Sequence, residues 1–283
     1  MSGHEADRHD TTARRQRFAE AARSERPDLA LLCLLVAAEA EPELGEAGID
    51  AAQIELDRLA GLLPYRPVGG ARGWAQAVAD LLGERHGFHG TPADYRRLDS
   101  SLLTHVLRRR RGLPILLSVV WIEVARRAGA PVYGVGLPGH FVVGFGERDA
   151  RILVDPFAGG RVLTGEDAEL LVTGATGEPL APSMLSPAEP LEIVLRILNN
   201  IRAWAAARPE QSAVQLWAVE LSLLLPSHPA RLRYERARLL VERGDFRVGA
   251  AELEDWAEIV APVDPDAAES ARHEALAARA KLN

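Results

Sequence analysis

Two side chains in the middle of the chain could form the acid–base part of a catalytic site. His140 follows a Pro-Gly turn, and Asp155 ends a short apolar run that leads into a second proline turn. If the intervening hairpin turn is centred on residues 147–148, His140 lies opposite Asp155, with the Cβ atoms roughly 5 Å apart. A carboxylate at that place orients an imidazole and stabilises its charged form, which is the second half of a catalytic triad.

Local signals predict the elements that carry these two residues. The segment from Leu113 to Val124 is nearly all apolar, and Pro114 suits the first turn of a helix. A Gly-Ala-Pro stop follows at 129–131, so we expect a helix that is buried on several sides. Beyond it, β-favouring runs predict short strands at Val132–Val135, Phe141–Phe145, Ile152–Val154 and Arg161–Leu163.

Four short motifs in this region resemble a known family. They are Arg-Arg-Gly-Leu-Pro-Ile-Leu-Leu-Ser from Arg110, Val-Ala-Arg-Arg-Ala-Gly from Val124, Leu-Pro-Gly-His-Phe from Leu137 and Val-Asp-Pro-Phe-Ala-Gly-Gly from Val154. In this order they are similar to the SirB family, whose members join a transglutaminase-like domain of the papain-type superfamily to tetratricopeptide-type helices. The resemblance covers residues 18–260 and is strongest over 95–163. It implies a buried helix opened by a nucleophilic cysteine, with the histidine and the aspartate on successive strands.

The chain departs from active transglutaminases at the nucleophile. Counting back from the Gly-Ala-Pro stop, the cysteine position of the family falls at about Pro114, which has no nucleophilic atom. The only cysteine, Cys33, lies far away in sequence and reads as a buried hydrophobic residue. Ser118 is the best replacement, because it lies one helical turn after Pro114, and Ser101 is a weaker one. Alternatively, the Ser118 hydroxyl donates to the Pro114 carbonyl inside the helix.

Other residues are candidates for binding. Arg111 ends a run of four arginines that could contact phosphate, cover a solvated helix end, or anchor an acidic loop or a partner segment. Gly139 would permit close backbone approach or a positive φ beside His140, and Trp121 lies in the apolar helix. A metal pair of His86 and His89 is conceivable, but no third ligand completes a recognisable spacing, so we expect no metal and no cofactor.

Composition bounds the class of protein. The 283 residues are 47% hydrophobic and carry a net charge of −7, which argues against general nucleic-acid binding. Lys281 is the only lysine, an arginine bias typical of a GC-rich bacterial genome. We see no signal peptide, and the apolar run Leu29–Ala38 is too short to span a bilayer, so we expect a cytoplasmic protein with no membrane partner.

The chain divides into three predicted parts. Residues 1–12 are polar and are expected to be disordered, 13–185 form the transglutaminase-like domain with its core at 95–165, and 186–283 form a tetratricopeptide-like helical region. Prolines 226 and 262 recur near the tetratricopeptide period, and Arg243-Gly244-Asp245-Phe246 resembles the turn between the helices of such a repeat. The predicted fold class is α+β, with a helical N-terminal segment, a papain-like core and C-terminal helical repeats.

Two functions follow from these features. Because the nucleophile is missing, we expect a non-catalytic interaction or regulatory protein with a protein or peptide partner. The alternative is a hydrolase or acyl-transfer enzyme that uses His140 and Asp155 with a relocated nucleophile such as Ser118. The sequence names neither a substrate nor a partner, and it leaves the oligomeric state open.

Overall fold

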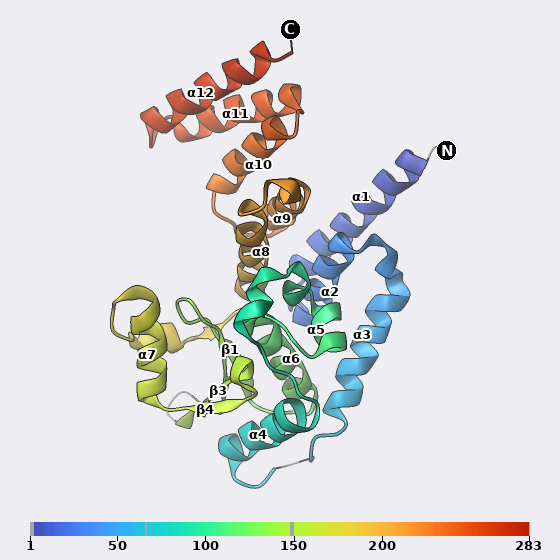
Figure 1. Cartoon of the computed structure of the whole chain (residues 1–283), viewed down its shortest axis with the longest axis vertical. Helices are drawn as coiled ribbons and strands as arrows, with labels where there is room; N and C mark the ends of the chain where they lie inside the picture. The colour runs from blue at the N-terminus through green and yellow to red at the C-terminus, as the bar shows by residue number, and fades with distance from the viewer. Residues whose placement is uncertain (1–2, 66, 148–149, 283) are drawn as a thin grey trace. The chain divides into compact units, whose positions relative to one another are not determined.

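The computed structural model describes residues 3–65, 67–147 and 150–282 (Figure 1). The chain forms two compact units, residues 1–197 and 198–283, and the division falls inside one helix. The first unit contains helices and one antiparallel sheet, and the second is helical. This is the α+β architecture that the sequence predicts.

The elements follow the chain in order. The helices are α1 (Gly3–Ala22), α2 (Leu29–Ala40), α3 (Gly45–Ala60), α4 (Gly70–Val78), α5 (Leu103–Arg109), α6 (Pro114–Arg127), α7 (Gly165–Thr176), α8 (Pro190–Ala206), α9 (Ser212–Leu224), α10 (Arg231–Glu242), α11 (Phe246–Val260) and α12 (Pro265–Ala280). The strands are β1 (Val132–Val135), β2 (Val142–Phe145), β3 (Ile152–Asp155), β4 (Arg161–Leu163) and β5 (Pro187–Ala188). Short helical turns of other types include η2 (Ala79–Arg85), η3 (Pro92–Arg96), η4 (Leu98–Ser101), η6 (Pro156–Ala158) and η7 (Pro182–Leu185).

Helix α6 is the centre of the first unit. It begins at Pro114, and every residue from Pro114 to Ala125 is buried. Contacts with α2, α3, α5, β1 and β2 surround it, which explains why its sequence is apolar on nearly every face. The prediction of a helix buried on several sides is confirmed.

The five strands form one antiparallel sheet in the order β4-β3-β2-β1-β5. The hairpin register predicted for β2 and β3 is wrong by two residues, because Val143 pairs with Val154 and not with Ile152. The segment that joins the strands covers residues 146–151, longer than the predicted turn, and residues 148–149 lie outside the described part of the chain. A shift of two keeps each side chain on its predicted face, because strand side chains alternate with period two.

Residues 174–190, which read as a linker from their Gly, Pro and Ser content, have more structure than the composition suggests. They contain the end of α7, the turn η7 and the strand β5, which pairs with β1 at the edge of the sheet. The sheet therefore extends past residue 185, where the sequence placed the end of the first domain. Proline is compatible with β5 because an edge strand has one side without ladder hydrogen bonds.

The N-terminal helices differ in part from expectation. Helix α1 begins at Gly3, within the segment that the sequence expected to be disordered; its alanine, glutamate and arginine residues favour helix once the chain continues into Phe18, which is buried. Asp28 caps the N-terminus of helix α2, because its carboxylate accepts from the Leu31 amide at 2.9 Å. Cys33 is buried in α2, and burial, followed by the charges of Glu123 and Asp28, raises the pKa of its thiol.

The second unit consists of the end of α8 and helices α9 to α12. The turn predicted at residues 243–246 joins α10 to α11: Gly244 has a φ of +89°, and the Asp245 carboxylate accepts from the Val248 amide. Helices α10, α11 and α12 bury small residues against one another, which allows their backbones to approach closely. This apolar cluster contains Ala237, Ala250, Leu253, Ala257, Ala268, Ala271, Ala275 and Ala278.

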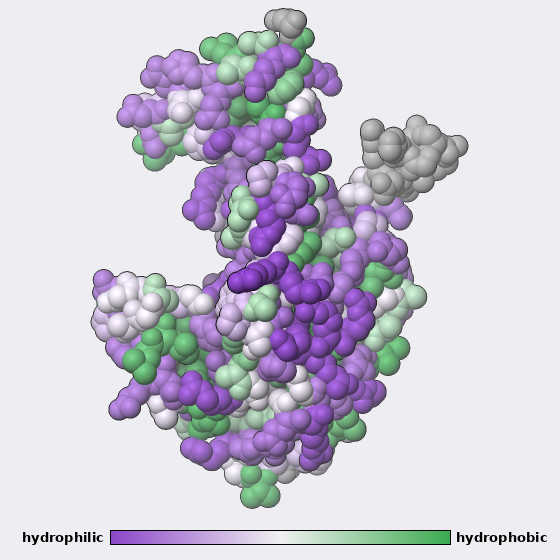
Figure 2. Space-filling view, viewed as in Figure 1, coloured by the Kyte–Doolittle hydropathy of each residue, from purple (hydrophilic) through white to green (hydrophobic). Residues whose placement is uncertain are grey.

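None of the helices in the described part of the chain combines the length and the apolar character needed to cross a bilayer. On the face of the molecule that Figure 2 shows, hydrophilic residues are spread widely and apolar residues occur in smaller groups.

A carboxylate inside the core makes stability depend on pH. Glu123 of α6 is fully buried and accepts two hydrogen bonds from Arg126, at 2.7 and 2.8 Å. Burial raises the pKa of Glu123, although Arg126 and Arg127 oppose the rise and Asp28 adds to it. The pKa of Glu123 is higher in the folded state than in the unfolded state. The stabilisation that comes from protonated Glu123 is therefore complete below about pH 4.3 and is lost as pH rises through the folded-state pKa.

We therefore expect the protein to lose stability relative to Glu123→Gln as pH rises from about 4 to 7, by about 1.4 kcal/mol for each unit of pKa shift. Urea unfolding of both proteins at several pH values measures this difference. Glu55→Gln is the control with the opposite sign, because the hydrogen bond from Arg58 lowers the pKa of Glu55. A difference between the protein and Glu123→Gln that does not change with pH contradicts the prediction.

Candidate functional site

The structure places His140 beside Asp155. The Nε2 atom of His140, which lies just before β2, is 3.1 Å from Oδ1 of Asp155 at the end of β3. The distance suits an ion pair when the ring is protonated, but the two groups are not aligned as a hydrogen bond. Among the described residues, the buried Nε2 has no hydrogen-bond partner. Oδ1 also accepts from the Phe157 amide at 2.9 Å, which fixes the carboxylate at the start of η6. The carboxylate is therefore held next to the imidazole ring, as in the second half of a catalytic triad.

Ser118 lies on α6 but is directed elsewhere. Its side chain is fully buried, and its hydroxyl donates to the Phe141 carbonyl at 3.4 Å, not to the Pro114 carbonyl. Among the described residues, no hydrogen bond joins the His140 ring to a serine, threonine or cysteine side chain. Ser101 is buried and Cys33 lies inside α2. The structure therefore brings His140 and Asp155 together without a hydroxyl or thiol hydrogen-bonded to the ring.

Two aromatic rings lie near the histidine–aspartate pair. The Phe157 ring stands edge-on to the His140 ring, with centroids 6.1 Å apart, and edge-on to the Tyr95 ring at 5.9 Å. Tyr95 is 50% exposed. Burial raises the pKa of the Tyr95 hydroxyl, and the charge of Asp155 raises it further. At neutral pH the site therefore offers a phenol that can donate a hydrogen bond near the carboxylate.

The backbone beside His140 is held from two sides. Gly139 has a φ of +70°, as its place in the Pro-Gly-His turn predicts, and a side chain there would collide with Ala175 of α7. Arg196 of α8 donates from Nη2 to the carbonyls of Leu137 and His140 at 2.6 and 2.7 Å. These contacts fix the loop that positions the imidazole.

Trp121, a candidate binding residue, belongs to the core in this structure. Its side chain is fully buried on α6, and its ring stands perpendicular to Phe88 with centroids 6.0 Å apart. Its Nε1 has no hydrogen-bond partner among the described residues. A ligand therefore has no access to this ring without opening the core.

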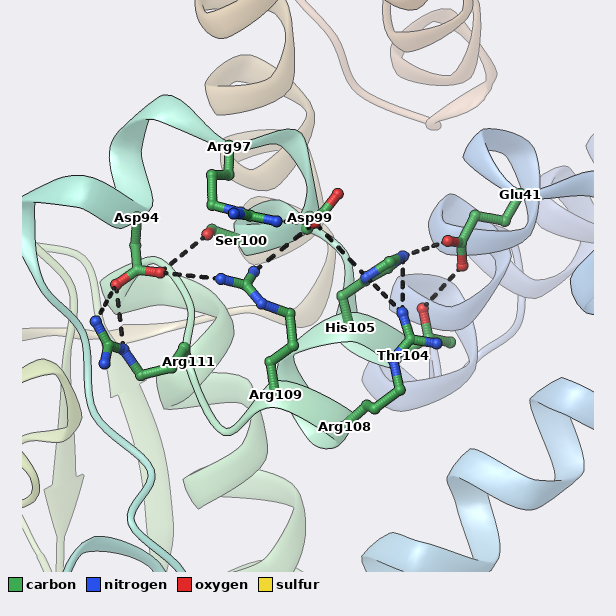
Figure 3. A network of polar contacts seen from close by, with 10 residues as sticks. All are labelled: Glu41, Asp94, Arg97, Asp99, Ser100, Thr104, His105, Arg108, Arg109 and Arg111. Carbon is green, nitrogen blue, oxygen red and sulfur yellow. Dashed lines mark hydrogen bonds and ion pairs between the residues drawn. The ribbon is translucent and has the colours of Figure 1, made fainter.

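Arg111 is part of a polar network around a buried carboxylate (Figure 3). Asp94, which is 2% exposed, accepts from the amide and hydroxyl of Thr91, both at 2.9 Å, and from Ser100 at 3.3 Å. Arg111 lies 3.3 Å from the same carboxylate and donates to Thr91 at 2.7 Å, while Arg109 lies 3.6 Å away. Burial raises the pKa of Asp94, but the hydrogen bonds from Thr91 and the charge of Arg111 lower it by more. The pKa of Asp94 therefore lies below its ordinary value.

The other arginines of the run are engaged as well. Arg108 hydrogen-bonds the His105 ring at 2.8 Å, and His105 in turn contacts Glu41 of the α2 end (Figure 3). Arg110 adopts a left-handed φ of +57° after α5 and donates to the His86 carbonyl at 3.1 Å. The run therefore ties three segments of the first unit together, which fits an anchoring role better than an open phosphate-binding patch.

His86 and His89, the possible metal pair of the sequence, lie in other surroundings. Nδ1 of His89 lies 2.8 Å from the Gly87 carbonyl. Burial, followed by the charge of Arg110, lowers the pKa of His86. Within residues 3–65, 67–147 and 150–282, no group of three or more His, Cys, Asp or Glu side chains is placed to hold a metal ion.

Sequence reasoning missed two residues of this region, Tyr95 and Arg196. Tyr95 lies 45 residues before His140 on a short turn, and Arg196 follows His140 by 56 residues on a helix that looked like part of the repeat region. Neither residue belongs to a motif whose spacing links it to His140 or Asp155. An arginine among the apolar residues of helix α8 is the feature of the sequence that could have pointed to a contact with the sheet.

Comparison with known proteins agrees with this arrangement. Residues 50–199 match the profile described as the transglutaminase-like superfamily, and 201–282 match a tetratricopeptide repeat profile. A UPF0162 protein of Xylella fastidiosa is 35% identical over 162 residues, 56% of this chain and 58% of the relative. A UPF0162 protein of Pseudomonas aeruginosa is 39% identical over 116 residues, covering 40% of this chain and 42% of that protein. Mouse F-box only protein 21 is 26% identical over 178 residues, 59% of this chain but 28% of its own length.

The matches cover both the fold and the motifs. The superfamily profile takes in more than half of the chain, including the buried helix α6 and strands β1 to β5. The matched region spans less than two thirds of the length of the UPF0162 relatives from Xylella and Pseudomonas. The chain belongs to the transglutaminase-like superfamily, with tetratricopeptide repeats after that domain, and its UPF0162 relatives agree with the SirB-like motifs of its sequence.

Proposed function

We propose that this protein is a non-catalytic interaction or regulatory module. The observation that carries the proposal is the direction of the Ser118 hydroxyl, which donates to the Phe141 carbonyl inside the core. Pro114 stands at the nucleophile position of the family, and among the described residues no serine, threonine or cysteine side chain hydrogen-bonds the His140 ring. The tetratricopeptide repeats support a role in protein–protein interaction.

The second unit, which contains the tetratricopeptide repeats, has a surface suited to such a role. A pocket of about 310 Å³ is lined by residues of α9, α10 and α11 and by His228. The half-buried Trp256 forms one wall of the pocket, and its ring contacts the Tyr234 ring with centroids 4.7 Å apart. Ile259, which is 53% exposed, also lines the pocket. Exposed Arg233 and Asp255 border it. An aromatic residue flanked by charged side chains is a common composition for a protein-binding surface.

Acyl trapping on the whole chain tests the absence of catalysis. We expect no acetyl adduct on Ser118 after incubation with p-nitrophenyl acetate, as read by peptide mass spectrometry, because the hydroxyl is buried and has no base. Ser118→Ala is the matched variant. An adduct on Ser118 that disappears in His140→Ala would establish the alternative, a hydrolase or acyl-transfer enzyme with a relocated nucleophile.

The interaction role has its own test. Proteins cross-linked to the full chain in bacterial cells are expected to be the same for His140→Ala and for the unmodified protein. Trp256→Ala is expected to reduce their recovery about tenfold, because an aromatic anchor of an interface contributes about 1–3 kcal/mol. Tyr65→Ala, an exposed aromatic residue of the first unit, is the control. Equal recovery with Trp256→Ala would remove this pocket from the proposal.

A further inference from the structure

Arg196 is a half-buried arginine that forms no ion pair with a carboxylate of the described residues. Its Nη2 is occupied by the Leu137 and His140 carbonyls, and no hydrogen bond from its Nη1 or Nε is formed with a described residue. By contrast, Arg202 pairs with Glu235, and Arg236 lies between Glu220 and Glu252. A half-buried cation that has no paired carboxylate can form a charge-assisted hydrogen bond with an anion that reaches its unoccupied N–H groups.

The guanidinium faces a pocket of about 350 Å³ in the first unit. Nη1 would be only 3.0 Å from a Cβ at Gly136, so the absence of a side chain there leaves room for the guanidinium at the pocket wall. The Phe141 ring lies 5.5 Å from the guanidinium carbon. Stacking on the ring and two carbonyl bonds fix the orientation of the cation before any ligand arrives, which reduces the entropy lost on binding.

The rest of the lining describes the ligand. Phe141, Met184 and Ile193 supply apolar surface, and the exposed side chains of Ser183 and Ser186 stand at the pocket along η7 and just after it. Glu192 also lines the pocket, with its carboxylate accepting from the Glu189 amide at 2.9 Å. One arginine and one glutamate favour a singly charged anion over a phosphate, and Glu192 can accept from an N–H of the ligand.

We propose that this pocket binds a carboxylate attached to an apolar group, with Arg196 as its anion anchor. The carboxylate would accept from Nη1 while the apolar group covers Met184 and Ile193. Two sources share this chemistry: the C-terminus of a peptide and a free small carboxylic acid. A peptide C-terminus adds an amide N–H that can face Glu192. The site is independent of the proposed lack of catalysis, because it requires no chemistry at His140.

Titration calorimetry with three probes tests the site on the full chain. The probes are acetyl-Gly-Gly-Leu, the same peptide as its C-terminal amide, and 4-methylpentanoate. We expect the peptide acid to bind about 10- to 100-fold more tightly than its amide, the range that a charge-assisted hydrogen bond supplies. Equal affinity for 4-methylpentanoate would identify a free small acid as the ligand, and weaker affinity would identify a peptide C-terminus.

Two variants locate the binding. Arg196→Gln is expected to abolish the preference for the acid, while Arg161→Gln, an exposed arginine of β4 paired with Asp167, keeps it. Because Arg196 also holds two carbonyls, Ser183→Trp serves as the second variant, which fills the pocket and leaves those bonds intact. No saturable binding of any probe, equal affinity for acid and amide, or unchanged binding by Ser183→Trp would overturn the proposal.

Discussion

Asp94→Ala is expected to lower the free energy of unfolding by about 3 kcal/mol, near the lower end of what breaking a buried ion pair costs. The Asp94 carboxylate accepts from Thr91 and Ser100 and lies against Arg109 and Arg111. Its removal leaves two cations and three donor groups without their shared acceptor. The guanidinium groups keep some contact with water, which limits the loss. Chemical denaturation at pH 7 measures it.

The chain contains a matched control for this substitution. Asp167 makes the same capping box with the amide and hydroxyl of Thr164, both at 2.8 Å, and pairs with Arg161 at 3.0 Å. It differs because the Asp167 side chain is 25% exposed whereas that of Asp94 is 3% exposed, so Asp167→Ala is expected to cost clearly less than Asp94→Ala. An equal loss in the two variants would show that burial of the Asp94 network contributes nothing.

The pH dependence gives a second readout of the same network. The pKa of Asp94 is lowered in the folded state, so its contribution is complete above the unfolded pKa of about 3.9 and is lost as pH falls through the folded one. The difference in stability between the protein and Asp94→Ala should therefore narrow at acidic pH. This sign is opposite to that expected for Glu123.

Trp121→Ala is expected to cost about 3–5 kcal/mol, the range for removing a large aromatic side chain from a core. The Trp121 side chain is fully buried against Phe88, and its Nε1 lies close to Gly160. Thermal unfolding measured by circular dichroism gives the loss. The same substitution tests the binding role that the sequence suggests for Trp121, because a binding residue would change partner affinity and leave stability nearly unchanged.

Trp121→Phe is the control for that prediction. It keeps most of the ring contact with Phe88 and removes the Nε1–H group, which has no partner among the described residues. We expect a much smaller loss than for alanine, because the smaller cavity is partly offset by removal of an unpaired buried donor. A loss equal to that of Trp121→Ala would mean that the core depends on the indole itself.

The pairing of His140 with Asp155 could be predicted because it depends on short-range rules. Strand side chains alternate with period two, so even a register wrong by two residues left both groups on one face of the sheet. The correct register depends on the length of the 146–151 segment, which turn residues alone do not fix. Helix α6 was predictable for a similar reason, because its apolar run has clear signals at both ends.

The contacts that complete the region could not be predicted in the same way. Arg196 reaches the His140 carbonyl from a helix 56 residues later, and a carbonyl acceptor leaves no mark on the sequence. Strand β5 has only two residues and one is a proline, so composition favours a loop there. The direction of the Ser118 hydroxyl depends on where Phe141 enters the sheet, which is a property of packing and not of helical spacing.

The thiol of Cys33 can report how often helix α2 separates from the helices packed against it. The thiol lies inside α2, between helices α1, α3, α5 and α6, and its raised pKa leaves almost no thiolate in the folded state. A thiol reagent can therefore react only when α2 separates from its neighbours, and the labelling rate measures the free energy of that event. Because the sequence has one cysteine, the signal needs no assignment. It would distinguish local release of α2 from global unfolding in every variant discussed above.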